Sequence, residues 1–172
     1  ILPPIIDPHL KRRAPRDPFV LVYLAFEDQT TVTQLLNRIG NHRFVQYAPD
    51  LDDGVVGNVT LRKTCLHGFR NDLQQATAVI CNAGFELVAE CLHLGTPVLA
   101  RPVQGQMEQI SNAFALQQLG WGQTLTKLDS DVMRNWLDRN DPISSVQYPD
   151  VAAALVNWVL GGDWTDQREL WE

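Results

Sequence analysis

The sequence is poor in positive charge and in cysteine, and it has no long apolar run. Fourteen lysine and arginine residues stand against twenty aspartate and glutamate residues, which gives a net charge of -6. This balance argues against a nucleic acid or an anionic membrane surface as a partner. No apolar run approaches the roughly 20 residues of a membrane-spanning helix, and no signal peptide is visible. We therefore expect a cytoplasmic protein without a transmembrane segment. Any peripheral membrane contact would be made by other parts of a full-length protein.

Few side chains are arranged in a way that suggests a metal site. The three cysteines are an odd number and lack the spacing of metal ligands. Cys81 and Cys91 stand in apolar surroundings, which is typical of reduced core thiols in a cytoplasmic protein. The aspartates of residues 49–54 could suggest a divalent metal, but aspartate and glycine also make turns, and we interpret this stretch as a turn. The sequence thus predicts no metal.

The chain divides into one predicted domain and two flanking arms. Its 172 residues, 45% hydrophobic and 20% charged, are ordinary for one soluble globular domain. Residues 1–17 contain four prolines and a basic triplet, and we interpret them as an interdomain linker. Residues 18–160 form the predicted domain, and residues 161–172 form a C-terminal tail. Because the chain starts at Ile1 rather than at methionine, we expect a domain cut from a longer protein.

Apolar runs alternate with helical periodicity from residue 19 onward. The continuous runs at 19–26 and 78–81 are typical of strands buried in a parallel sheet. Further strands are predicted at 43–47, 59–63, 97–100 and 121–125, and helices at 32–39, 67–75, 85–94, 109–118, 130–137 and 151–160. The sequence therefore predicts an α/β fold, a Rossmann-like, doubly wound sheet of about six mainly parallel strands with helices on both faces.

Residues 78–113 carry the clearest candidate site. Both of their strands should end at the edge of the sheet where ligands of open α/β folds bind. The turn at Asn82-Ala83-Gly84 would place unpaired N–H groups at a helix N-terminus, which suits a phosphate, and Gly84 leaves room for its close approach. On the same helix, the Glu90 carboxylate could accept hydrogen bonds from a vicinal diol such as ribose. Glu108-Gln109 would offer acceptors and an amide to a second polyol.

The order of residues in this region resembles the C-terminal donor-binding domain of GT-B glycosyltransferases that use nucleotide sugars. It is similar to the cell-wall N-acetylglucosaminyltransferases, to the UDP-glycosyltransferases of plants and animals, and to an uncharacterised set of prokaryotic glycosyltransferase-like proteins. The specific match covers residues 69–113. Its features are Phe69 to Leu73, the Gly84 turn and its helix, Glu90, Gly95-Thr96-Pro97, Pro102, Glu108-Gln109 and Asn112-Ala113.

The resemblance implies the donor half of a transferase whose substrate is a nucleoside diphosphate sugar, a UDP-sugar, with no metal cofactor. The acceptor, an unidentified hydroxyl, and the general base would belong to an N-terminal domain that this sequence lacks. We therefore assign no catalytic residue and expect the fragment alone to be inactive. The implied donor-binding residues are Phe69 and Arg70 at the uracil, Asn82, Gly84, Phe85 and Glu86 at the turn, Glu90 at the ribose, and Glu108 and Gln109 at the sugar.

Two departures from the family pattern leave other functions open. Many GT-B donor domains have a glycine-rich first loop, whereas here Glu27–Thr31 has no glycine, and we expect Thr30 or Thr31 to cap the next helix. Glu86 stands where a small hydroxylic or amide residue is often found, and its charge would repel a phosphate. One alternative is a non-catalytic nucleotide-sugar-binding or interaction module. The other is a nucleotide-sugar 2-epimerase, although no convincing acid/base set is visible.

The candidate residues also have ordinary structural interpretations. Phe69 is more often a core aromatic than a platform for a base. Glu90 could be a plain exposed helix residue, and Glu108 could simply favour the first turn of its helix. We favour donor contacts for Glu90 and for Glu108-Gln109, because the resemblance assigns contacts to these positions.

Overall fold

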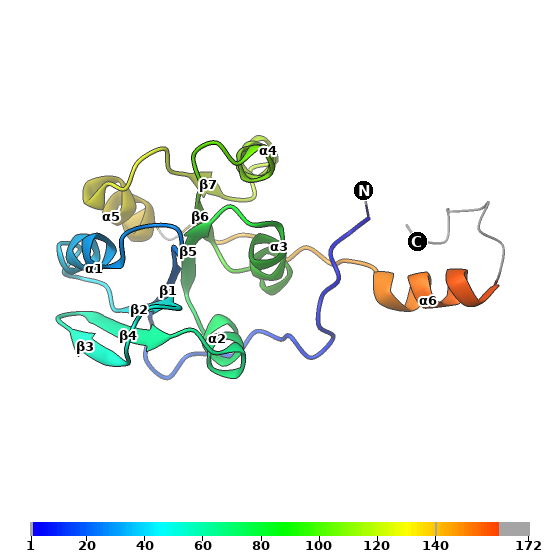
Figure 1. Cartoon of the computed structure of the whole chain (residues 1–172), viewed down its shortest axis with the longest axis horizontal. Helices are drawn as coiled ribbons and strands as arrows, with labels where there is room; N and C mark the ends of the chain where they lie inside the picture. The colour runs from blue at the N-terminus through cyan, green and yellow to red at the C-terminus, as the bar shows by residue number, and fades with distance from the viewer. Residues whose placement is uncertain (1, 140, 162–172) are drawn as a thin grey trace.

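The computed structural model describes residues 2–139 and 141–161. Within them, a seven-stranded sheet is flanked by helices on both faces (Figure 1). The strands are β1 (Val20–Tyr23), β2 (Phe44–Ala48), β3 (Gly54–Val56), β4 (Val59–Lys63), β5 (Ala78–Asn82), β6 (Val98–Arg101) and β7 (Gln123–Thr124). The helices are α1 (Gln29–Asn37), α2 (Leu66–Leu73), α3 (Phe85–Leu94), α4 (Met107–Gln118), α5 (Ser130–Arg139) and α6 (Val151–Gly161).

The strand order is β3-β4-β2-β1-β5-β6-β7, and only the β3–β4 pair is antiparallel among the described strands. The chain builds outward from β1 in one direction and then returns to the other side of β1 at β5. This reversal between β1 and β5 is the switch point at which doubly wound sheets bind ligands, beyond the carboxyl ends of the strands. The predicted α/β, Rossmann-like fold is confirmed.

Both faces of the central strands are buried, which explains their continuous apolar runs. Leu21 of β1 packs in the core shared with α2, α3 and α4, whereas Val20 and Val22 pack in the core shared with α1 and α5. The two cores alternate along the strand because successive side chains point to opposite faces. Burying one such side chain contributes roughly 1.5–3 kcal/mol. The carboxyl end of β1 is therefore held firmly from both sides.

Helix α1 is capped by Asp28, so the predicted cap at Thr30 or Thr31 was wrong. The Asp28 carboxylate accepts a hydrogen bond from the backbone N–H of Thr31 at 2.8 Å. Hydrogen bonds from the Thr31 hydroxyl and then from its N–H lower the pKa of Asp28. Thr31 is thus a donor to the cap, because the helix begins earlier than its apolar periodicity indicated.

The strand β3 was missing from the sequence prediction. Residues 49–54 were expected to form only a turn, but Gly54 also begins β3, whose three residues are all exposed. With no buried side chain, β3 has no apolar pattern, and its pairing with β4 defines it. The turn itself is present, and Asp53 Oδ1 accepts a hydrogen bond from the Lys63 N–H at 2.8 Å. The runs at 19–26 and 121–125 also yield shorter strands than predicted.

The segment before β1 lies against the domain. Leu10 is buried in the core that contains α2 and α3. Arg12 donates hydrogen bonds to the carbonyl of Ala76 and, at 2.8 Å, to Thr96 Oγ1, and burial lowers its pKa. Arg13 N–H donates to Gln74 O at 2.8 Å. These contacts bring residues 10–13 close to the ends of α2 and α3. No helix in the described part of the chain is both long and apolar enough to cross a membrane.

Candidate functional site

Three neighbouring strands bring their loops together at the carboxyl edge of the sheet. β5 lies between β1 and β6, and Asn82 and Arg101 are the last residues of β5 and β6. These two residues are paired in the parallel register. Asn82 Nδ2 donates a hydrogen bond to Arg101 O at 3.1 Å. The turn after β5 and the loop after β6 are therefore fixed relative to each other.

Helix α3 begins directly after Gly84 with an open N-terminus. Among the described residues, no side chain caps this helix. The first N–H groups of a helix lack intrahelical partners and carry partial positive charge, so they are available to an anion. A Cβ atom built on Gly84 would meet no described atom within 4 Å, and its φ of -68° suits any residue. Gly84 thus leaves space for a ligand and is not required by backbone strain. The turn is stabilised by Asn112 Nδ2, which donates a hydrogen bond to Ala83 O at 3.1 Å.

A cavity of about 360 Å³ lies beside the first turns of α3. Its lining consists of residues 3–7, Arg70, Phe85, Glu86 and Glu90. Burial raises the pKa of Glu90, the charge of Arg70 opposes the rise, and the charges of Glu86 and Asp7 add to it. A half-buried carboxylate in this state gains from hydrogen-bond donors, such as the two hydroxyls of a ribose. The structure thus brings together four of the residues that the sequence singled out.

The α2 residues are already engaged with other parts of the chain. Phe69 packs edge-to-face against Tyr23 and Tyr47, with ring centroids 5.3 and 5.2 Å away. Its ring therefore belongs to the edge of the core, as the structural interpretation of Phe69 predicted. Arg70 Nη1 lies 2.7 Å from Asp7 Oδ2, in an ion pair with the segment before β1. A nucleobase contact at this position would accordingly use the backbone.

Glu108 and Gln109 lie in the first turn of α4 but differ sharply in exposure. Glu108 is exposed in the first turn, whereas Gln109 is only 6% exposed. Gln109 Oε1 accepts a hydrogen bond from the Val103 N–H at 3.0 Å. Gln109 therefore braces the loop after β6, and only its amide nitrogen is left for a ligand in the predicted role.

The sequence prediction did not pick out the ion pair between Glu27 and Arg101 as part of the site. Arg101 Nε lies 3.1 Å from Glu27 Oε1, and the two side chains are 19% and 18% exposed. Glu27 follows β1 and Arg101 ends β6, so the pair joins loops on either side of β5. No local sequence signal marks this ion pair, because the proximity of Glu27 and Arg101 depends on the strand order.

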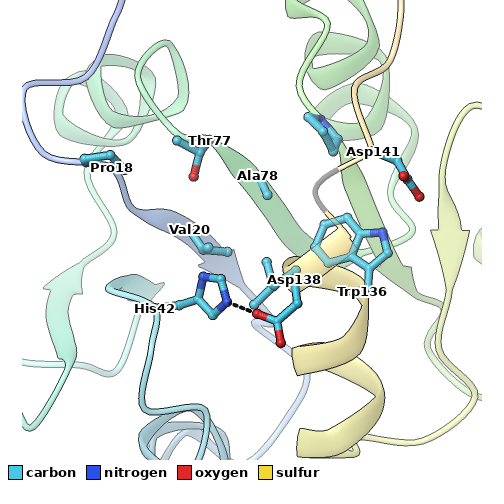
Figure 2. A pocket seen from close by; sticks show the side chains of 10 residues that line it. Pro18, Val20, His42, Thr77, Ala78, Trp136, Asp138 and Asp141 are labelled. Atoms are coloured by element: carbon cyan, nitrogen blue, oxygen red, sulfur yellow. Dashed lines mark hydrogen bonds and ion pairs between the residues drawn. The ribbon is translucent and has the colours of Figure 1, made fainter.

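A second cavity, of about 470 Å³, lies at the opposite edge of the sheet (Figure 2). It is lined by the first residues of β1 and β5, Val20 and Ala78, and by Trp136 of α5. His42 Nε2 and Asp138 Oδ1 point toward each other across 3.0 Å. None of the predicted donor-site residues lines this cavity. Across residues 2–139 and 141–161, no three His, Cys, Asp or Glu side chains gather as a metal site.

The described residues form a Rossmann-like domain with an open turn at its switch point, and solved glycosyltransferase structures share this fold. The calicheamicin glycosyltransferase matches with a TM-score of 0.60 at 21% identity, over 80% of this chain and 37% of that one. Acinetobacter baumannii MurG matches with a TM-score of 0.51 at 14% identity, over 72% of this chain and 41% of that one. At these identities the likeness concerns the fold.

Sequence comparison identifies the family. The model of glycosyl transferase family 1 matches residues 1–140, and the chain belongs to this family. An uncharacterised glycosyltransferase of Methanosarcina acetivorans is 31% identical over 81 residues, which are 45% of this chain and 21% of the relative. The chain thus spans about a fifth of the length of that curated relative.

Proposed function

We propose that this chain binds a nucleoside diphosphate sugar, with UDP as the nucleotide, as the donor half of a glycosyltransferase. The observation that supports the proposal is that α3, the helix that follows β5, combines an uncapped N-terminus with a cavity beside Glu90. One helix would then offer backbone amides to the diphosphate and a carboxylate to the ribose. In a longer protein, the glycosyl group would pass to a hydroxyl acceptor held by an N-terminal domain.

The N-terminus of α3 would contribute most at the moment of bond cleavage. As the bond between the sugar and the diphosphate breaks, negative charge grows on the leaving UDP, and preorganised N–H dipoles stabilise that charge without a metal ion. Because the net charge of the chain is -6, this stabilisation must be local. Glu108 and the Gln109 amide nitrogen would hold the donor sugar. The proton of the acceptor hydroxyl would go to a base in the N-terminal domain.

Titration calorimetry with UDP, UDP-glucose and UDP-N-acetylglucosamine tests the proposal. We expect all three to bind, and Glu90→Ala to weaken UDP binding by roughly 1–3 kcal/mol because a charge-assisted hydrogen bond to ribose is lost. Asp52→Ala is a matched control, since it removes an exposed carboxylate from the turn before β3 and should leave the affinity unchanged. An unchanged affinity in Glu90→Ala would remove Glu90 from the site.

A non-catalytic interaction module is the second candidate. It is favoured by the acidic surroundings of the Glu90 cavity, to which Glu86 and Asp7 add two further carboxylates. If none of the three nucleotides binds, this module becomes the better description. Conversion of UDP-N-acetylglucosamine to its 2-epimer would instead identify the epimerase. Incubation of this chain alone with UDP-sugars and a broad panel of acceptors should give negligible transfer, and robust transfer would show that the catalytic base lies within the chain.

A further inference from the structure

The Glu27–Arg101 ion pair spans the central strand β5 at its carboxyl end. Arg101 ends β6 and Glu27 lies in the loop after β1, and both strands are direct neighbours of β5. Since neighbouring strands are about 4.8 Å apart, β1 and β6 are separated by about 10 Å, and side chains that meet between them span the width of β5 near its carboxyl end. The chain leaves β5 there and turns at Gly84 into α3. The Arg101 guanidinium is therefore held at the same edge of the sheet as the open N-terminus of α3.

The ion pair is shielded but poorly aligned. Arg101 Nε has no hydrogen bond within the described part of the chain, although it lies 3.1 Å from Glu27 Oε1. The second contact, from Arg101 Nη2 to Glu27 Oε2, is long at 3.4 Å. Guanidinium groups bind most strongly when two parallel N–H groups meet two oxygens, an arrangement that phosphates offer. Glu27 thus neutralises the charge of Arg101 but does not use all the N–H donors of the guanidinium.

The Glu27 backbone is anchored by Gln29, whereas the polar contacts of its carboxylate are those with Arg101. Gln29 Nε2 donates to Glu27 O at 2.7 Å and to Leu24 O at 2.9 Å. Gln29 Oε1 in turn accepts from Gln46 Nε2 at 3.0 Å. This network fixes the path of the loop after β1. The Glu27 side chain can consequently release Arg101 by rotation, with no change in the loop.

We propose that Arg101 binds the diphosphate of the nucleotide sugar and that the Glu27 carboxylate takes the place of the diphosphate in the free protein, where it holds the guanidinium at the carboxyl edge until the donor displaces it. This inference rests on the proposed function and adds a side-chain cation to the backbone amides of α3. Glu27 competes with the diphosphate for Arg101, so it lowers donor affinity and excludes ligands with too little negative charge to displace it.

The test compares UDP with uridine in calorimetric titrations of the whole chain. We expect Arg101→Met to weaken UDP binding roughly 10- to 100-fold, the value of a charged hydrogen bond, and to leave uridine binding within about twofold. Arg101→Lys keeps the charge but loses the planar guanidinium group. Its UDP affinity should lie between those of the unaltered chain and Arg101→Met. Glu27→Gln should tighten UDP binding, because it removes the competitor. Arg43→Met is the matched control, since it removes one arginine from an exposed ion pair with Asp17 before β2.

The outcomes separate this inference from the proposed function. If UDP does not bind the unaltered chain, both are overturned. If UDP binds and Arg101→Met changes its affinity no more than Arg43→Met does, only the role of Arg101 is overturned. A purely structural ion pair would make Arg101→Met and Glu27→Gln act in the same direction, with UDP and uridine weakened alike. Should Arg101→Met fail to fold, the UDP and uridine affinities of Arg101→Lys and Glu27→Gln test the role of Arg101 in the same way.

Discussion

The two edges of the sheet differ in the backbone groups that they present. At the carboxyl edge, α1, α3 and α4 follow β1, β5 and β6, so three helix N-termini gather there. At the amino edge, the chain enters those strands, and the cavity beside His42 is lined by prolines and strand starts (Figure 2). The cavity at the amino edge is larger than the Glu90 cavity, at about 470 against 360 Å³. Helix dipoles instead favour the carboxyl edge for an anionic ligand, whatever the volume.

The ion pairs at the two edges sharpen this contrast. His42 and Asp138 have side chains 24% and 52% exposed, whereas Arg101 and Glu27 are 19% and 18% exposed. An exposed pair is screened by water and contributes little, while a shielded cation retains its attraction for a phosphate. The less exposed pair lies at the carboxyl edge, which is where we propose that the anionic ligand binds.

Trp136→Ala should have the largest effect, and on stability alone. Trp136 is 8% exposed and packs α5 against the sheet beside the amino-edge cavity. Its removal should lower the free energy of unfolding by roughly 3–5 kcal/mol, measured by denaturant titration. UDP affinity of the folded fraction should not change. Trp121→Ala is the control, because Trp121 is 38% exposed and should cost only about 1 kcal/mol. Loss of UDP binding in folded Trp136→Ala would move the ligand to the amino edge.

Gly84→Asp should affect binding and stability in opposite directions. The position has room for a side chain, and an acidic N-cap should stabilise α3 by a few tenths of a kcal/mol. The same carboxylate would occupy the amides proposed for the diphosphate and repel it, so UDP affinity should fall roughly 100-fold. Calorimetry and thermal unfolding measure the two effects.

Gly40→Asp provides the matched control for that variant. Gly40 also has no described atom within 4 Å of a built Cβ, and it precedes β2 on the amino side of the sheet. The added charge is the same, so any loss of UDP affinity common to both variants would reflect net charge rather than the α3 turn. Equal losses of UDP affinity in Gly84→Asp and Gly40→Asp would contradict a binding site at the carboxyl edge.

The predictable parts of the fold are those whose signals are local. β5, β6 and the start of α3 lie within one residue of their predicted bounds, because apolar runs and Gly84 mark them directly. The exposed strand β3 escaped prediction because only its pairing with β4 defines it. The cap of α1 was misplaced because apolar periodicity begins after the helix itself does.

The candidate site shows the same division. Glu90 and the Gly84 turn could be predicted, since they lie on one short segment with a family pattern. Glu27 and Arg101 are 74 positions apart, and only the placement of β5 between β1 and β6 brings them together. Asp7 likewise reaches Arg70 across 63 positions from a segment interpreted as linker. The donor-binding roles of Glu90, the Gly84 turn and Arg101 stay predictions until a nucleotide is bound.

The smallest effect should be a pH-dependent gain in stability from Glu90→Gln. Burial, the largest cause, raises the pKa of Glu90 above its ordinary value of 4.5, so the folded state holds the proton more tightly than the unfolded state does. The stability that Glu90 contributes is therefore present below pH 4.5 and is lost as pH rises through the folded-state pKa. At neutral pH, Glu90→Gln should unfold at a higher temperature than the unaltered chain, and the gap should close near about pH 4.

Glu108→Gln is the control for this measurement, because it makes the same chemical change at an exposed position in the first turn of α4. It should show no comparable gap. A lower unfolding temperature for Glu90→Gln at neutral pH would mean that the attraction of Arg70 outweighs burial, and that the carboxylate is already satisfied within the chain. Glu90→Gln can thus be tested for two effects at once, a higher unfolding temperature and weaker UDP binding. If both appear, the charge of Glu90 lowers the stability of the fold and contributes to ligand binding, as expected of a residue in a binding site.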